Sequence, residues 1–315
     1  MKKFNFSKPA FIYKTIKLKN SPFVSHNVKP IPIKINETTL RIFFVSRLKD
    51  DTPSPTFIDV DINDPKKIKK INKKILVKYG ENGAFDSDGI GFTQITPYKN
   101  KYLIQYSGWK RSRYKMTIDM GIGYLLADKK LTKFTKISTG PVIHKDMLNP
   151  LGVAASYLLK DNKKYKLFYC RLIKWIKAEH DYEMIYTICG AESNNIFNWK
   201  FYKKPLIKQK FSTEVVSAPE VKKINGNYYM WYSYRGAINK KIKKFKIGFA
   251  YSKNGIDWKR LDKKNVPKIS NIKDDWNYES NCYPMFYKYK SKHYVFYSGN
   301  GTGKKGFGFS NVKIV

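Results

Sequence analysis

Hydrophobic and polar residues alternate along most of the chain in short runs rich in Tyr, Phe, Ile and Val, a pattern typical of β-strands. Within residues 214–236, two such runs are separated by the pair Asn225-Gly226. Asn-Gly between two strand-like runs is a strong signal for a tight β-hairpin. The pattern therefore predicts a hairpin here, with a polar residue at each end.

The second strand of this hairpin has four counterparts elsewhere in the chain. The five runs are LRIFFVSR, YLIQYSGW, YKLFYCR, YYMWYSYR and HYVFYSGN, with small anchor residues at Ser46, Ser107, Cys170, Ser233 and Ser298. The intervals between the anchors are 61, 63, 63 and 65 residues. Each run follows one apolar segment and precedes another, with no helical periodicity between them. A repeat of this kind predicts an all-β fold, a five-bladed β-propeller of four-stranded antiparallel blades.

The two ends of the chain complete this prediction. The last repeat leaves few residues for a fourth strand, whereas the strand-like segment 9–18 is unassigned. We expect this N-terminal strand to close the ring as the outer strand of the last blade. No linker composition interrupts the repeat, so residues 1–315 are predicted to form one domain. The Lys-rich segments 66–74, 174–181 and 238–246 are expected to be loop insertions.

The composition adds a strong positive charge, with 62 Lys and Arg against 24 Asp and Glu. This imbalance suggests an acidic partner such as nucleic acid, an anionic membrane or an anionic glycan, or else a general enrichment in lysine. No RNA-binding signature accompanies the charge, which makes nucleic acid the weaker alternative. The three cysteines match neither a disulfide framework nor a metal site, and we expect no metal and no cofactor. No apolar run reaches membrane-spanning length and no signal peptide is evident, so a cytoplasmic location is expected.

Residues just before the innermost strands of a propeller meet at one mouth of the central channel, and acids recur there. The predicted catalytic residues are Asp86, Asp88, Glu214 and Glu279, the last two each lying five residues before a proline. Two or three carboxylates around a sugar can act as general acid, base and electrostatic modulator. The alternatives are turn-forming roles for the two aspartates and solvated loop positions for the two glutamates. Glu220, inside a strand, is expected to be a structural charge partner.

The ends of the second strands point to the same mouth and suggest substrate contacts. The predicted binding residues are His26, Arg47, Trp109, Arg171, Arg235, Tyr283 and Asn300. Arginines hold hydroxyl, carboxylate or phosphate groups in fixed geometry, and aromatic rings form flat platforms for sugars. His26 could equally be a buried, hydrogen-bonded histidine. The Gly-rich segment 298–308 precedes a strand rather than a helix, so it is expected to be a tight turn and not a phosphate-binding loop.

Across residues 24–310 the chain resembles the five-bladed β-propeller superfamily of glycoside hydrolases, which includes arabinanases, xylosidases, invertases, levansucrases and mannoside phosphorylases. The resemblance rests on SHNVKPIP, FFVSR, FIDVD, GAFDSDGIG, YSGW, IGYLLAD, GPVI, MWYSYRG, IGFAYSKNGIDW, DWNYESNCYP and YSGNGTGKKGFGFS. It implies sugar binding in the central cavity, an acid on the second blade matched by Asp86 or Asp88, and a later Glu matched by Glu214 or Glu279. The first blade departs from the pattern, because Ser25-His26-Asn27 supplies no carboxylate.

The residues and the resemblance together predict a carbohydrate-active enzyme that acts on a glycosidic bond of a bacterial surface polysaccharide or its precursor. The substrate is expected to be a carbohydrate, anionic or phosphorylated in view of the positive charge. Because blade one lacks an acid, a glycosyltransferase or a phosphorylase on the same scaffold is the first alternative. A glycan-binding propeller without catalysis is the second.

Overall fold

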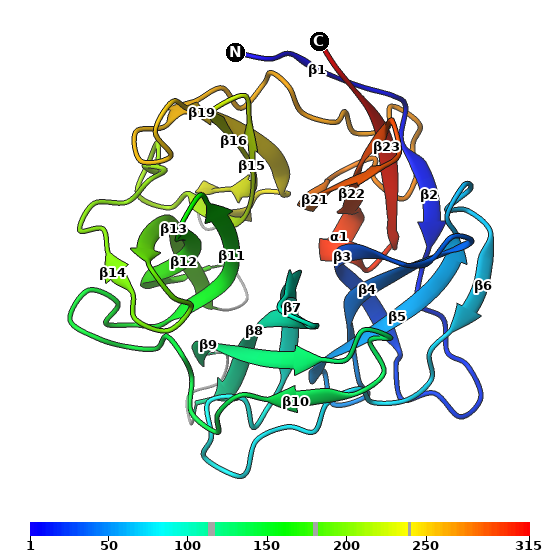
Figure 1. The fold of residues 1–315 in the computed structure, drawn as a ribbon, viewed down its shortest axis with the longest axis horizontal. Helices are drawn as coiled ribbons and strands as arrows, with labels where there is room; N and C mark the ends of the chain where they lie inside the picture. Colours follow the sequence, from blue (N-terminus) through cyan, green and yellow to red (C-terminus); the bar gives the residue numbers. More distant parts are fainter. Residues whose placement is uncertain (113–116, 179–181, 239–240) are drawn as a thin grey trace.

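The computed structural model describes residues 1–112, 117–178, 182–238 and 241–315, which form five β-sheets arranged as blades around a central axis (Figure 1). The predicted all-β, five-bladed propeller is confirmed. The first blade consists of β3 (Ser25–Asn36), β4 (Thr39–Arg47), β5 (Pro53–Asp61) and β6 (Ile68–Ile71). The second consists of β7 (Ile90–Tyr98), β8 (Lys101–Arg111), β9 (Ile118–Ala127) and β10 (Phe134–Lys136). In both blades each strand is antiparallel to the next.

The remaining blades repeat this order from the axis outward. The third contains β11 (Val153–Asp161), β12 (Lys164–Lys177), β13 (Tyr182–Ser193) and β14 (Lys200–Phe201). The fourth contains β15 (Val215–Ile224), β16 (Asn227–Arg235), β19 (Lys246–Ser252) and β20 (Lys259–Arg260). The fifth contains β21 (Cys282–Tyr289), β22 (Lys292–Ser298) and β23 (Phe307–Ile314). A short turn of helix, α1 (Asn300–Gly303), connects β22 to β23.

The N-terminus closes the ring as predicted. Strands β1 (Phe4–Phe6) and β2 (Ala10–Tyr13) both pair antiparallel with β23, and Phe4 lies opposite Ile314. The two chain ends therefore lie in one sheet, at the top of the view in Figure 1. This pairing gives the last blade its outer strands and ties the first residues of the chain to the last.

The predicted hairpin in the fourth blade is also present. Asn225 and Gly226 connect β15 to β16 with φ angles of 48° and 78°. Two successive residues with positive φ are the requirement of the tight hairpin turn that matches the twist of the strands, and Asn-Gly adopts it at low cost.

The anchor residues of the repeat join neighbouring blades. Four of them accept a hydrogen bond from a backbone amide on the innermost strand of the following blade: Ala155 N to Ser107 Oγ (2.9 Å), Ala218 N to Cys170 Sγ (3.2 Å), Tyr283 N to Ser233 Oγ (2.8 Å) and Lys29 N to Ser298 Oγ (3.1 Å). All four acceptors are buried. Each amide belongs to a residue with positive φ where the strand register shifts. The periodic Ser or Cys therefore satisfies an amide that a β-bulge removes from the ladder.

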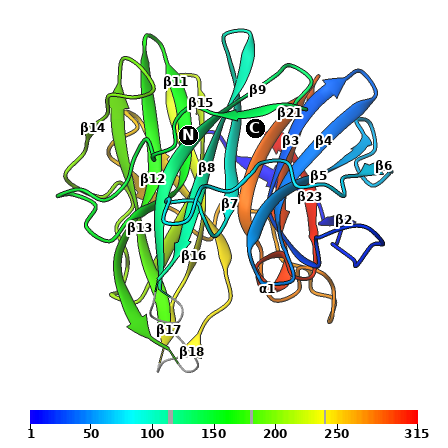
Figure 2. The same cartoon turned by 90° about the horizontal axis from the view of Figure 1, so that it is seen from below.

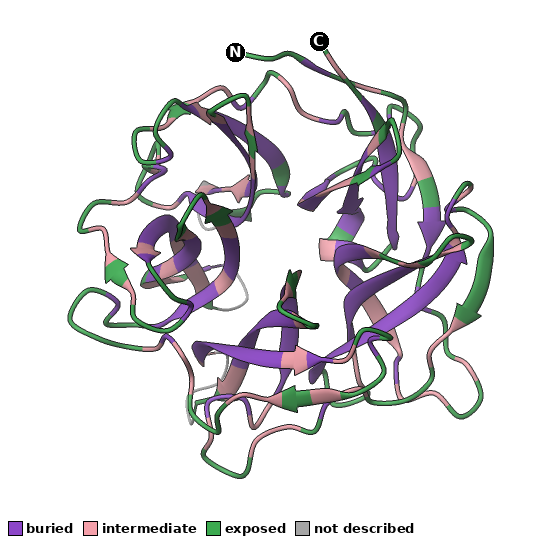
Figure 3. Ribbon diagram, in the orientation of Figure 1, coloured by how far each residue is buried: buried purple, intermediate pink, exposed green. Residues whose placement is uncertain are grey.

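Apolar side chains pack together between the blades, and most of the strand residues near the axis are coloured as buried in Figure 3. Between the fourth and fifth blades, for example, Trp231 is fully buried and its ring lies 4.1 Å from that of Phe286. Because each sheet buries both faces against its neighbours, the strands near the axis read as apolar runs. No helix in the described part of the chain is long and apolar enough to cross a membrane.

The Lys-rich segments expected to be loop insertions are partly strands, so that prediction was wrong. Segment 66–74 contains β6, the outer strand of the first blade. Strand β12 continues through Lys177 and pairs with β13 well beyond the anchor Cys170. Segment 238–246 contributes to a small hairpin of β17 (Ala237–Ile238) and β18 (Lys241–Ile242), which projects from one side of the ring together with the end of β12 (Figure 2). These strands are rich in lysine, so their composition resembles that of a loop.

Candidate functional site

A cavity of about 230 Å³ lies on the axis and is lined by residues from all five blades. It opens on the side where the innermost strands begin, since residues near the starts of β3, β7, β11, β15 and β21 contribute to its wall. Its charged lining residues are Lys29, Arg47, Glu183 and Arg235, and its large aromatic ones are Phe92, Trp109, Tyr186, Phe245 and Tyr283. Among the described residues, the cations of the lining thus outnumber its carboxylate by three to one.

Arg47 occupies the last position of β4, on the first blade. Its guanidinium lies 4.8 Å from the centre of the Trp109 ring on the second blade, and its Nη1 donates to the carbonyl oxygen of Asp51 at 2.9 Å. Burial is the main cause that lowers the pKa of Arg47 from its ordinary value. The cation–π contact and the carbonyl hold the group in place while leaving other N–H groups for a ligand.

Arg235 and Glu183 form an ion pair across the third and fourth blades. Arg235 ends β16 and its guanidinium also lies 4.3 Å from the Phe245 ring, whereas Glu183 is on β13. Nε of Arg235 is buried and has no hydrogen-bond partner among the described residues. The pair therefore combines a held carboxylate with a guanidinium whose donors are only partly used.

Two tyrosines complete the wall near these charges. Burial raises the pKa of Tyr283 and of Tyr186, so both hydroxyl groups are neutral donors at ordinary pH. The hydroxyl of Tyr186 donates to Met184 Sδ at 2.8 Å. Tyr283 is within electrostatic reach of both Arg235 and Arg47. Flat rings beside cations suit a polar ligand with one apolar face, as sugars have.

Sequence reasoning identified four of the lining residues, Arg47, Trp109, Arg235 and Tyr283, and missed Glu183 and Lys29. Glu183 was missed because the hairpin of β12 and β13 extends beyond the repeat unit, into residues taken for a loop. Alternation of apolar residues through Ile185 was the signal available. Lys29 was missed because one lysine among so many has no distinguishing pattern.

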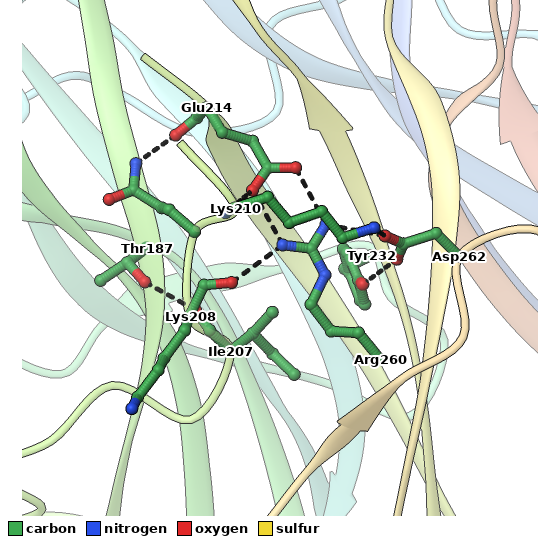
Figure 4. A network of polar contacts seen from close by, with 9 residues as sticks. Thr187, Ile207, Lys208, Lys210, Glu214, Tyr232, Arg260 and Asp262 are labelled. Atoms are coloured by element: carbon green, nitrogen blue, oxygen red, sulfur yellow. Dashed lines mark hydrogen bonds and ion pairs between the residues drawn. The ribbon is translucent and has the colours of Figure 1, made fainter. Parts of the chain in front are cut away.

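Two of the predicted catalytic acids have charged partners away from the cavity lining, although Oδ1 of Asp86 has no hydrogen-bond partner among the described residues. Glu214 accepts two hydrogen bonds from the Arg260 guanidinium, at 2.8 and 2.9 Å, and one from the Lys210 amide at 2.7 Å (Figure 4). Asp86 accepts a hydrogen bond from the Tyr106 hydroxyl at 3.0 Å and pairs with Lys136 at 2.6 Å. Both carboxylates are almost completely buried.

The other two predicted acids also lie outside the lining of the cavity. Asp88 Oδ2 accepts hydrogen bonds from the Arg111 amide at 2.9 Å and from the Ser87 hydroxyl at 3.1 Å. The side chain of Glu279 is 48% exposed and lies 3.3 Å from Lys244. The structure therefore does not gather the four acids around one cavity.

Three predicted binding residues have partners within the protein and are absent from the lining. His26 Nδ1 lies 2.9 Å from the Ser25 hydroxyl, and burial, followed by Arg47, lowers its pKa. Arg171 donates from Nε to Asn149 Oδ1 at 3.0 Å. Asn300 Oδ1 accepts from two backbone amides at 2.9 and 3.0 Å, which ties α1 to the segment before β21.

Metal binding has no support from the described residues, because they contain no group of three or more His, Cys, Asp or Glu side chains that could hold an ion. Glu220, expected to be a structural charge partner, forms a buried ion pair with Lys222 at 2.8 Å. The chemistry available in the cavity is that of cations, aromatic rings, hydroxyl groups and one carboxylate.

Comparison with known proteins agrees with this architecture. No family model matches the chain. It is 27% identical over 290 residues to the uncharacterized protein Rv1502 of Mycobacterium tuberculosis, covering 91% of this chain and 92% of that protein. A glycoside hydrolase superposes with a TM-score of 0.71 at 13% identity, over 96% of this chain and 92% of the other.

A second solved structure comes from the mannoside phosphorylase family that contains glycoside hydrolases targeting β-1,2 mannosidic linkages in Candida mannan. It superposes with a TM-score of 0.67 at 13% identity, over 98% of this chain and 93% of the other. At such identities these likenesses show the fold. The predicted resemblance to the five-bladed propellers of glycoside hydrolases is thereby confirmed at the level of architecture.

Proposed function

We propose that the chain transfers a sugar from a donor with a phosphate leaving group to a hydroxyl of an acceptor carbohydrate, in the central cavity. The observation that carries this proposal is the charge content of the cavity wall, where the described residues include Arg47, Arg235 and a single carboxylate, Glu183. Two arginines suit a phosphate, which they can bind through paired N–H donors.

The number of carboxylates that line the cavity favours glycosyl transfer over glycoside hydrolysis. Glycoside hydrolysis generally uses two carboxyl groups flanking the scissile bond, one as acid and one as base or nucleophile. Within the described residues, no second carboxylate lines the cavity. Transfer from a phosphate donor needs one general base, because the leaving phosphate requires charge stabilisation rather than a proton.

Glu183 is the proposed base. The acceptor hydroxyl loses its proton to the Glu183 carboxylate as its oxygen bonds to the anomeric carbon, while the bond from that carbon to the phosphate oxygen breaks and the phosphate departs with the electron pair. The Arg235 guanidinium contacts this carboxylate and holds it in place. The same guanidinium and Arg47 then neutralise the charge that develops on the phosphate.

The names of the structural neighbours support a glycosidic bond as the reacting group, because they include glycoside hydrolases and a phosphorylase family. A bacterial surface polysaccharide or its precursor remains the proposed product class. Phosphate-bearing sugar donors are made in the cytoplasm, so the proposal retains the cytoplasmic location. The catalytic roles predicted for Asp86, Asp88, Glu214 and Glu279 remain predictions, and their contacts support structural roles instead.

A turnover assay tests this function. The protein is incubated in phosphate-free buffer with panels of sugar 1-phosphates and nucleotide sugars, with and without acceptor sugars, and the release of phosphate or nucleoside diphosphate is measured. We expect release that depends on the acceptor and is lost in Glu183→Gln. Cleavage of a glycan by water alone would favour the hydrolase, and binding of glycans with no turnover in any arm would favour a glycan-binding propeller.

A further inference from the structure

The bulged residues of the innermost strands occupy equivalent places around the axis. Lys29, Ala155, Ala218 and Tyr283 have φ angles of 54°, 47°, 53° and 55°, and each donates its amide to the anchor of the preceding blade. Three of these positions carry neutral side chains, whereas the first blade carries a lysine. The backbone role of this position therefore does not require the lysine side chain, since alanine fills it in two blades.

The buried side chain of Lys29 lowers the stability of the folded chain. It is 3% exposed, lines the cavity, and its Nζ has no hydrogen-bond partner among the described residues. Burying an ammonium group without a partner is strongly unfavourable, and such groups respond by losing affinity for the proton. Burial accordingly lowers the pKa of Lys29 to about 8.

The charged and titratable neighbours of the amine do not supply the missing partner. Glu220 on β15 raises the pKa of Lys29 through space, but no hydrogen bond or ion pair joins the two side chains among the described residues. Oε1 of Glu220 contacts Lys222 at 2.8 Å and accepts from the Phe286 amide at 3.2 Å, and its buried Oε2 is itself without a partner. The thiol of Cys170 on β12 is kept neutral, because burial raises its pKa to about 12. Lys29, Glu220 and Lys222 together carry one excess positive charge, and the amine of Lys29 has no direct partner among the described residues.

The strand register places Lys29 deeper in the cavity than Arg47 and Arg235. Arg47 pairs with Ser25, and Arg235 pairs with Val215, at the starts of β3 and β15. Lys29 lies four residues further along β3, on the order of 10 Å from the level of Arg47 at a rise of about 3.3 Å per residue. An anion held by the two arginines would therefore leave the amine free.

We propose that the inner part of the cavity around Lys29 is a second oxyanion subsite, which takes a carboxylate or phosphate group carried by the sugar itself. The ligand would present one anionic group to Arg47 and Arg235 and another to Lys29, which makes it an acidic or phosphorylated sugar. The assignment rests on the proposed function only in taking the ligand to be a carbohydrate. The three N–H groups of the ammonium would acquire acceptors, and the cost of burying it would be offset on binding.

Calorimetric titration of glucuronate 1-phosphate, glucose 1,6-bisphosphate and glucose 1-phosphate at pH 7 tests this subsite without turnover, because the first two carry a second anionic group for Lys29 and the third does not. We expect the doubly anionic sugar that fits to bind at least tenfold more tightly to the wild type than to Lys29→Ala, because the variant lacks the charged donor for the second group. Lys305→Ala, which removes an exposed lysine, serves as the control for charge and should bind as the wild type does. Comparing the carboxylate-bearing sugar with the phosphate-bearing sugar identifies which anionic group Lys29 binds.

A labelling experiment gives an independent measurement on the folded protein. Reductive methylation followed by mass spectrometry reports the reactivity of Lys29, and saturating doubly anionic sugar should protect it while glucose 1-phosphate should not. Equal affinity of the wild type and Lys29→Ala for all three sugars, or labelling of Lys29 that no anion slows, would overturn the proposal. Binding that depends on Lys29 in a protein without transferase activity would instead retain the subsite and refute the proposed reaction.

Discussion

Two groups of charges in this propeller differ in how completely they are paired. Behind the start of β15, Glu214 and Asp262 are joined to Arg260 and Lys210 by contacts of 2.7 to 2.9 Å, and the Tyr232 hydroxyl donates to Asp262 as well (Figure 4). In the cavity, by contrast, the amine of Lys29 has no hydrogen-bond partner among the described residues. The first group is neutral as a whole, and the second carries excess positive charge.

How completely a charged side chain is paired distinguishes structural charges from functional ones better than burial or residue type does. A buried carboxylate that already accepts several hydrogen bonds has no lone pair left for a substrate, and removing it leaves an arginine unpaired. A buried cation without a partner lowers stability unless a ligand supplies that partner. Substitutions in the cavity should therefore affect turnover, whereas substitutions in the paired group should affect stability.

The largest effect is expected for the cavity carboxylate. Glu183→Gln removes the proposed base and should lower the turnover number by roughly 10²–10⁴-fold, the usual contribution of a positioned acid or base. The apparent affinity for the donor should change little. Glu279→Gln, at an exposed acid, is the matched control in the same kinetic assay. Retained turnover in the first variant would exclude Glu183 as the base.

The next largest effect is expected for the paired group around Glu214, and it should appear in the free energy of unfolding instead of in turnover. Glu214→Gln weakens a buried ion pair and should reduce the free energy of unfolding by roughly 3–5 kcal/mol. Denaturant unfolding followed by tryptophan fluorescence measures the difference. Glu279→Gln should stay within about 0.5 kcal/mol of the wild type, because the pair that it removes is at the surface. Similar effects of the two substitutions would show that the paired group is not structural.

Lys29→Met should raise stability, since it replaces a buried amine with an apolar side chain of similar length. The pKa of Lys29 is about 8 in the folded chain against an ordinary 10.5, so its protonated form destabilises the fold fully below pH 8. Between pH 8 and 10.5 the unfolded chain binds more protons, and wild-type stability rises with pH relative to the variant. The variant should therefore exceed the wild type by about 3 kcal/mol at pH 7 and by little above pH 10.5. A pH-independent difference would contradict this account.

The smallest effect is expected for the hydrogen bond between the Ala218 amide and Cys170 Sγ, which connects the third and fourth blades. Cys170→Ser should change the free energy of unfolding by less than about 1 kcal/mol, because serine accepts the equivalent amide hydrogen bond in three other blades. Cys170→Ala leaves the buried Ala218 amide without an acceptor and should cost about 1–3 kcal/mol. Thermal unfolding of the two variants, compared in parallel, measures the value of the acceptor.

The fold could be predicted from the sequence because its main determinants are local. Each anchor residue ends an apolar run, and Asn225-Gly226 determines its turn through backbone preferences alone. Closure by the N-terminal strand followed from counting strands. The lysine-rich outer strands escaped prediction, since an exposed strand packs on one face only and shows little apolar pattern.

The site could be predicted only where local position constrains a side chain. Arg47 and Arg235 end the second strands of their blades, next to the axis, and the ring geometry brings them together. Glu214 and Glu279 share the same offset from a proline but have different surroundings. The first packs under Arg260 of the outer strand β20, whereas the second lies in the long segment before β21.

The sequence by itself determined the number of blades, their strand order and the closing of the ring, because these depend on repeated apolar runs and on turn residues. Only the tertiary structure decided which charges face the cavity and which are neutralised within the protein. That decision depends on partners distant in the chain, such as Arg260 for Glu214 and Arg235 for Glu183, which no local pattern records. The amine of Lys29 stands out for the same physical reason, since a missing partner can be recognised only when every neighbour is in place.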